Sequence, residues 1–144
     1  MTGTVLVTGG AGDIGSHVVR QLGDAGRPVV VLDNLSKGFR EAVLHGELVV
    51  GDTSNIELVS RLLAEHNVEA VMHFAAHTIV PESVADLLKY YGNNTSSTRN
   101  LLSCCHAAGV KHVIFSSTDA VYGEPDVEVT SETTPTNPIN PYGL

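Results

Sequence analysis

Short apolar runs alternate along this chain with longer segments in which apolar residues recur every three or four positions. The runs have strand length, and most are apolar through their centres, as in parallel strands buried on both faces. We expect strands at residues 5–8, 28–33, 47–51, 70–75 and 111–117. This alternation predicts an α/β fold in which helices cover both faces of a parallel sheet.

The segments between the strands have helical periodicity. Apolar residues at helical spacing predict crossover helices over residues 13–25 and 55–66. The stretch 82–108 is too long for one ordinary helix and carries Gly92, Asn93 and Asn94 near its middle, so we expect a break or kink there. Right-handed crossovers then give a Rossmann-type doubly wound sheet of order 3-2-1-4-5, with a ligand crevice at the carboxyl ends of the first and fourth strands.

Three glycines follow the first strand where it turns into a helix: Gly9, Gly12 and Gly15 form a G-x-x-G-x-x-G motif. In this context they permit a tight turn, a close approach of the backbone to a pyrophosphate, and close packing of helix on strand. Asp33 ends the second strand about 20 residues later, where it can accept hydrogen bonds from a ribose 2′-hydroxyl and repel a 2′-phosphate. We therefore expect a dinucleotide site that prefers NAD to NADP.

Several other candidate groups have a structural interpretation. His73 falls in a predicted strand and His77 in the following loop, so they do not share a helix face as a zinc pair would, and no metal site is expected. Tyr90 and Tyr91 are expected to pack rather than to catalyse. Asp52 follows the third strand, where its carboxylate can either face an adenine amino group or cap the next helix.

Composition and charge narrow the classes of partner. The chain has 16 acidic and 8 basic residues among 144, a formal net charge of −8, which argues against an extended nucleic-acid surface. The first residues lack the basic region of a signal peptide, and no apolar run is long enough to span a bilayer, so we expect a cytoplasmic protein with no membrane partner. Cys104 and Cys105 are neighbours in a helical pattern, where their side chains diverge, and are expected to be reduced.

Seven segments along the chain match sequence motifs of a known family: VTGGAG-x-IGSH, VVLDNLS, VVGD, VMHFAAH, NNTSSTRNLL, VIFSST-x-AVYGE and TPTNPINPYG. Together they resemble the extended short-chain dehydrogenase/reductases, and within that family the UDP-glucose 4-epimerases. The resemblance implies NAD as the cofactor. It implies that the following residues contact NAD: Gly9, Gly12, Asp13, Ile14, Gly15, Asp33, Asn34, Asp52, Thr53, Phe74, Ala75, Ala76, Asn94 and Ser116.

The same resemblance implies two catalytic residues. Tyr142 matches the tyrosine of Y-x-x-x-K and would take a proton from the sugar 4-hydroxyl while hydride leaves C4 for the nicotinamide. Thr118 would hydrogen-bond the sugar oxygen and position it. Sugar dehydratases of the same superfamily read T-D-E-V-Y-G at strand five, whereas this chain has Ala120 in place of the glutamate, which favours the epimerase.

The chain also departs from the family pattern. Asp13 stands where the family usually has an aromatic residue, and its charge would repel a pyrophosphate. The sequence ends at Leu144, two positions before the lysine of the Y-x-x-x-K motif. We therefore expect a sheet that stops before a sixth strand, NAD binding without complete catalysis, and UDP-sugar binding only if a substrate domain were present. A stand-alone NAD-binding module and a fragment of a nucleotide-sugar dehydratase or reductase are the alternatives.

The last part of the chain is rich in proline and lacks helical periodicity. We expect a dinucleotide-binding domain over residues 1–118 and a loop-rich tail over 119–144. In such a tail the simpler interpretation of Tyr142 is an exposed aromatic residue. The strand at 111–117 would have a free, apolar edge, which predicts a homodimer or domain exchange through this edge, or else a tail packed across it.

Overall fold

A parallel sheet organises the chain in the computed structural model, which describes residues 3–126 and 128–144. Its strands are β1 (Thr4–Thr8), β2 (Val29–Asp33), β3 (Glu47–Val50), β4 (Val68–His73) and β5 (His112–Phe115). They lie in the order β3-β2-β1-β4-β5, and every neighbouring pair is parallel. The predicted doubly wound topology is therefore confirmed, and the carboxyl ends of all the strands lie along one edge of the sheet.

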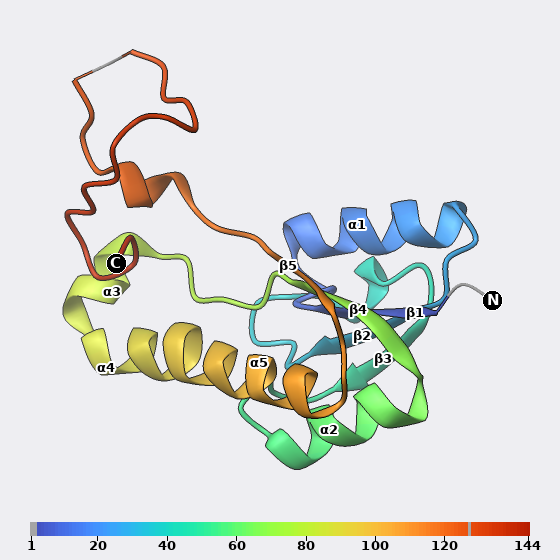
Figure 1. Ribbon diagram of the computed structural model, residues 1–144. Helices are drawn as coiled ribbons and strands as arrows, with labels where there is room; N and C mark the ends of the chain where they lie inside the picture. The colour runs from blue at the N-terminus through green and yellow to red at the C-terminus, as the bar shows by residue number, and fades with distance from the viewer. Residues whose placement is uncertain (1–2, 127) are drawn as a thin grey trace.

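Helices cover both faces of this sheet: α1 (Asp13–Asp24) lies on one face, and α2 (Ile56–Glu65) and α5 (Ser97–Ala107) on the other (Figure 1). Side chains alternate along β1, so the core has two layers. Val7 packs with Val19 of α1, whereas Leu6 packs with Leu62 of α2 and Leu101 of α5, and all five are at most 2% exposed. Burial of each such side chain is worth about 1.5–3 kcal/mol, so the strand ends that carry the loops are firmly held.

The long helical stretch is interrupted as predicted, but by a widened turn rather than by a gap. It is divided into α3 (Val80–Ala85), α4 (Leu87–Tyr90), the π-helical segment η2 (Tyr91–Ser96) and α5. The hydroxyl of Ser97, the first residue of α5, donates to the carbonyl of Gly92 in the π-helical segment at 3.1 Å. A further break falls at Asp86, whose side chain caps α4 by accepting from the backbone N–H of Lys89 at 3.1 Å.

Two short 3-10 helices, η1 (Arg40–Ala42) and η3 (Asp119–Tyr122), complete the regular structure of the described residues. The tail after η3 folds beside α3 and α4, away from the edge of β5 (Figure 1). Within the described ranges no backbone hydrogen bond joins the tail to β5, and Ile114 and Phe115 are 56% and 59% exposed. The expectation that the tail packs across this edge is wrong, because the tail docks on the helices instead.

Both cysteines belong to the core rather than to the surface. Cys104 and Cys105 are buried and unbonded to each other on α5. Burial raises the pKa of the Cys105 thiol. Within residues 3–126 and 128–144, each helix is too short or too polar to cross a bilayer.

Candidate functional site

The glycine loop, residues 9–15, turns the chain from β1 into α1 and leaves no room for a side chain at Gly9 or Gly15. Gly9 has φ of +71°, and a Cβ there would lie 2.6 Å from the backbone nitrogen of Ala75. A Cβ at Gly15 would overlap the carbonyl oxygen of Gly9. The N–H of Gly12 donates to the carbonyl of Gly9 at 3.1 Å and closes the turn. The loop therefore requires glycine, and its bare backbone can be approached closely.

The helix that follows this loop begins without a side-chain cap. Its N-cap residue is Gly12, which has no side chain to satisfy the N–H groups of the first turn. These groups and the helix dipole favour an anion at this end. By contrast, α2 begins at Asn55, whose side-chain oxygen accepts from the N–H of Leu58 at 3.0 Å. Asn55 therefore fills the capping role that the sequence left open for Asp52.

Asp33 lies at the carboxyl end of β2 and is 8% exposed. One carboxylate oxygen accepts from the N–H of Ala11 at 2.9 Å and the other from the N–H of Leu35 at 2.8 Å. Each oxygen retains capacity for a further donor such as a hydroxyl. Asp33 lines a small hollow, called the inner cavity, which is formed by Gly9, Gly12, Leu32, Asp33, Asn34, Ser36, Lys37, Gly38, Gly51, Asp52, Thr53, Phe74, Ala75, Ala76, His77 and Asn93.

A hydrogen bond joins the ends of β2 and β3 on the wall of the inner cavity. The side-chain amide of Asn34 donates to Asp52 at 2.8 Å, and the N–H of Ser54 donates to the other Asp52 oxygen at 2.8 Å. Burial opposes ionisation of Asp52, but the bonds from Ser54 and Asn34 outweigh it, so the pKa of Asp52 lies below its ordinary value. The wall therefore presents an ionised acceptor.

A larger hollow of about 680 Å³, called the outer cavity, continues from the inner one across the start of α1. Asp13, Ile14 and Gly15 line its α1 side, and Ser116 and Thr118 line its β5 side. Its volume is in the range of small-molecule sites, about 300–1,000 Å³. Asp13 is exposed, so its carboxylate can lie at the mouth of this cavity rather than inside the fold.

Tyr142 borders the outer cavity and a third hollow of about 270 Å³ that also contacts Asn94. It is half-buried, and its ring meets the ring of Tyr90 edge-on, with centroids 6.4 Å apart. Tyr90 is 2% exposed and accepts from the N–H of Ile79 at 2.8 Å. The interpretation of Tyr142 as an exposed residue in a loose tail is therefore wrong, because this long-range contact holds it at the cavity.

His73 and His77, the two histidines considered above as a metal pair, have separate hydrogen-bond partners. His73 of β4 is 3% exposed and lies between the hydroxyls of Thr8, at 2.5 Å, and Thr98, at 2.9 Å. Burial lowers the pKa of His73 to about 4, so the ring is neutral. His77 lies in the loop after β4, where its backbone N–H and carbonyl pair with the side-chain amide of Asn94 at 2.8 and 2.9 Å. In the described part of the chain no group of three or more His, Cys, Asp or Glu side chains converges on a possible metal position.

The structure brings every predicted site residue to the edge of one of these three cavities. Among the described residues, however, no hydrogen bond joins Thr118 to Tyr142, because the Thr118 hydroxyl instead accepts from the N–H of Ala120 at 3.2 Å. Sequence reasoning missed Lys37 and its neighbour Gly38, which line the inner cavity. The signal for them was the polar turn that directly follows Asp33.

Comparison with known proteins gives one consistent result. The sequence profile of the NAD dependent epimerase/dehydratase family matches residues 5–144. The UDP-glucose 4-epimerases of Azospirillum brasilense and Lactobacillus helveticus are 54% and 50% identical to the chain, each over 140 residues. These alignments cover 96% of this chain but only 40% and 42% of the relatives.

Solved structures agree with the sequence relatives. UDP-glucose 4-epimerase from Brucella ovis in complex with NAD matches with a TM-score of 0.95 and 44% identity, covering 99% of this chain and 44% of that one. The Bifidobacterium longum enzyme in complex with NAD+ and UDP matches with a TM-score of 0.91 and 39% identity, covering 97% and 44%. The chain thus spans less than half the length of these proteins and is homologous to their amino-terminal, NAD-binding part. It belongs to the NAD-dependent epimerase/dehydratase family.

Proposed function

We propose that this chain binds NAD as the nucleotide-binding part of a nucleotide-sugar 4-epimerase. The observation that carries the proposal is that the glycine loop, the uncapped start of α1 and the carboxylate of Asp33 meet beside one cavity. In such a loop Gly9 permits the tight turn, Gly12 lets the backbone approach a pyrophosphate, and Gly15 lets the helix pack closely on the strand. The residues present therefore fit the dinucleotide.

Each part of the site has a distinct task in this proposal. The N–H groups at the start of α1 bind the phosphates, Asp33 and Asn34 hold the adenosine ribose, and Asp52 and Thr53 face the adenine. When bound, NAD supplies a reversible hydride acceptor. Tyr142 would hold the proton of the sugar hydroxyl at its phenolic oxygen, and Thr118 would orient the sugar oxygen once its present bond to Ala120 is exchanged.

Calorimetric titration of the chain with NAD and with NADP tests the proposal without requiring turnover. Asp33 accepts hydrogen bonds from ribose hydroxyls and repels a 2′-phosphate, so NAD is expected to bind more tightly than NADP. Asp33→Asn provides the matched variant, because it removes the charge and keeps the shape, and it should narrow the difference. Absence of NAD binding would overturn the proposal. Equal affinity for the two cofactors would show that Asp33 does not contact the ribose 2′-hydroxyl.

The activity of the whole enzyme is a further part of the proposal. The relatives are more than twice as long as the chain, so we expect the isolated 144 residues to show no 4-epimerisation of a UDP-sugar even with NAD saturating. The measurement is product formation by protein purified from a host that lacks its own epimerase. Turnover that persists in such a preparation would mean that these residues suffice, and the stand-alone binding module would be excluded.

We also propose that the isolated chain pairs with a second copy through β5. This edge strand presents unpaired backbone groups and the exposed side chains of Ile114 and Phe115, and such edges recruit further strands. Sedimentation over a concentration series should show a dimer, and Ile114→Lys should abolish it because charge blocks edge pairing. A monomer at all concentrations would contradict this pairing.

A further inference from the structure

Lys37 is the cation of the cleft. Of the 8 lysines and arginines in the chain, all within the described residues, Lys37 alone lines the inner or the outer cavity. The acidic side chains along the same two cavities are Asp13, Asp33, Asp52, Glu82 and Asp119. A dinucleotide would bring the negative charge of its pyrophosphate into this acidic cleft, so one cation there has more effect than a cation on open surface.

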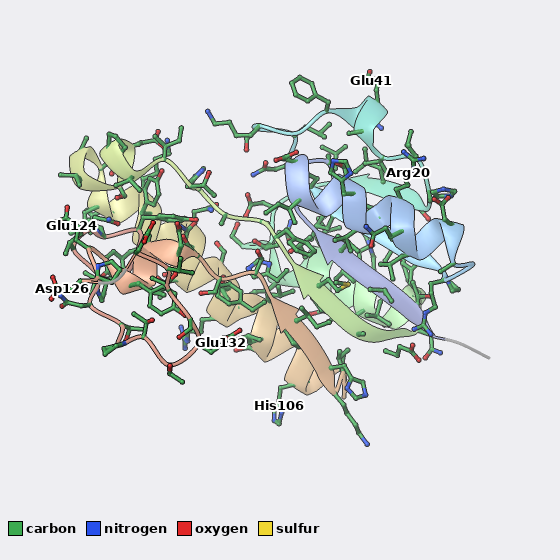
Figure 2. All side chains as sticks on the ribbon, turned by 90° about the horizontal axis from the view of Figure 1, so that it is seen from above. Arg20, Glu41, His106, Glu124, Asp126 and Glu132 are labelled. Atoms are coloured by element: carbon green, nitrogen blue, oxygen red, sulfur yellow. The ribbon has the colours of Figure 1, made fainter. Side chains whose placement is uncertain are left out.

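Arg20, the one arginine of α1, lines neither the inner nor the outer cavity. Glu124, Asp126 and Glu132 lie on the tail side of the molecule, whereas Arg20 of α1 lies toward the opposite side (Figure 2). Arg20 is in addition paired with Asp24 at 3.6 Å. Arg20 therefore does not offset the acidic groups of the cleft.

The loop that carries Lys37 is shaped by its own hydrogen bonds. Asp33 accepts from the N–H of Leu35 at 2.8 Å, and Asn34 accepts from the N–H of Ser36 at 3.0 Å. Leu35 has φ of +55°, which a branched residue adopts only when its surroundings enforce it. These turns reverse the chain directly after β2.

Two contacts fasten the far end of this loop to the glycine loop. The N–H of Phe39 donates to the carbonyl of Ala11 at 3.0 Å. Gly38 packs so closely that a Cβ there would lie 2.7 Å from the carbonyl carbon of Ala11. Ala11 immediately precedes Gly12, the N-cap of α1. Lys37 is therefore anchored beside the free N–H groups of α1.

We propose that Lys37 forms the ion pair with the pyrophosphate of the dinucleotide and offsets the charge of Asp13. The inference rests on the proposed NAD binding and names the residue that sets its strength. No salt bridge in the described ranges involves Lys37, whereas Lys89 is engaged by Glu82 at 2.5 Å. Its ammonium is free to pair, and hydrogen bonds between ionised groups are among the strongest in proteins.

The test compares Lys37→Gln with Lys111→Gln by titration with NAD at low and high ionic strength. Lys111 is exposed and precedes β5 at the amino end of the sheet, so its variant makes the same charge change away from the cleft. Lys37→Gln should weaken NAD binding about tenfold at low salt, the effect of one charged hydrogen bond. It should also remove most of the salt dependence, since the screening length is about 10 Å at 0.1 M salt. Lys37→Arg should restore binding, and Lys111→Gln should change little.

Ligands that contain only part of NAD show which group of the dinucleotide contacts Lys37. Binding of adenosine, which carries no phosphate, should be the same in Lys37→Gln and in the unaltered chain, whereas ADP-ribose should lose affinity as NAD does. A loss confined to NADP would assign Lys37 to a 2′-phosphate and overturn the proposal. Equal NAD binding by the folded Lys37→Gln variant, checked by circular dichroism, would also overturn it but leave the proposed function intact. Failure of the unaltered chain to bind NAD would overturn both.

Discussion

Helices α1 and α2 both start at the carboxyl edge of the same sheet, yet their first turns are built in opposite ways. Asn55 satisfies the start of α2 from its own side chain, whereas Gly12 leaves the start of α1 open. Glycine at the N-cap costs only about a few tenths of a kcal/mol relative to a capping side chain, so the open terminus is tolerated at little loss of stability. The missing cap at α1 keeps its first N–H donors free, which is what the proposed binding of a phosphate requires.

The largest expected effect concerns His73 at the carboxyl end of β4, whose ring pairs with the hydroxyls of Thr8 on β1 and Thr98 on α5. Its pKa in the folded chain is about 4, below the ordinary 6.5, so between these values only the unfolded chain takes up the proton. The contribution of His73 to the free energy of unfolding is therefore fully present above pH 6.5. It falls by about 3 kcal/mol as the pH drops toward 4. Urea unfolding at pH 7 and pH 4 measures this, and His73→Gln should lack that part of the slope. The same slope in both proteins would show that His73 is not the titrating group.

Restoring a side chain in the glycine loop should break the open terminus. In Gly15→Ala the new Cβ would overlap the carbonyl of Gly9, so we expect a loss of about 1–3 kcal/mol in stability and of most NAD affinity. Gly92→Ala is the control, because nothing lies within 4 Å of its Cβ position. Thermal unfolding and NAD titration of the two variants measure the difference. NAD binding by Gly15→Ala at unaltered strength would contradict the tight fit of the loop.

The side-chain cap of α2 is expected to matter for stability and not for NAD binding. Asn55→Ala should lower the free energy of unfolding by about 1 kcal/mol, because the N–H of Leu58 loses its acceptor. NAD affinity should stay unchanged, since Asn55 lines none of the three cavities. Denaturant unfolding and calorimetry on the same sample separate the two quantities. A variant that lost NAD binding but kept its stability would reverse the roles assigned to these helix ends.

The smallest expected effect concerns charge at the open terminus. Asp13 is exposed and lines the outer cavity, where its carboxylate lies beside the expected phosphates. Asp13→Tyr should strengthen NAD binding by up to about 1 kcal/mol. Asp24→Asn, at the far end of α1, is the matched control for loss of charge. An unchanged dissociation constant in Asp13→Tyr would show that Asp13 points into solvent.

The order of the strands could be predicted from the sequence, because it follows from local periodicity and the right-handed crossover. The glycine loop and Asp33 could be predicted from the residues themselves. Glycines at this spacing directly after a strand, with an acidic residue about 20 positions later, form a dinucleotide-binding motif. Other cavity residues, such as Phe74, Asn94 and Thr118, could be named only from the resemblance to a family.

The pairing of Tyr142 with Tyr90 could not be predicted, because it joins residues far apart in the chain through packing of the tail. Lys37 was missed for a similar reason: its position depends on the contact between Phe39 and Ala11.

The packing of the tail against α4 also determines which part of the molecule tyrosine spectroscopy can monitor. The chain has no tryptophan and 4 tyrosines: Tyr90, Tyr91, Tyr122 and Tyr142. The first two lie where α4 passes into η2, Tyr122 ends η3, and Tyr142 rests edge-on against Tyr90. Near-ultraviolet absorption and emission of tyrosine therefore monitor this end of the molecule alone and are silent about the sheet. A spectroscopic melting curve of the protein would record release of the tail from α4 and could miss the opening of the core.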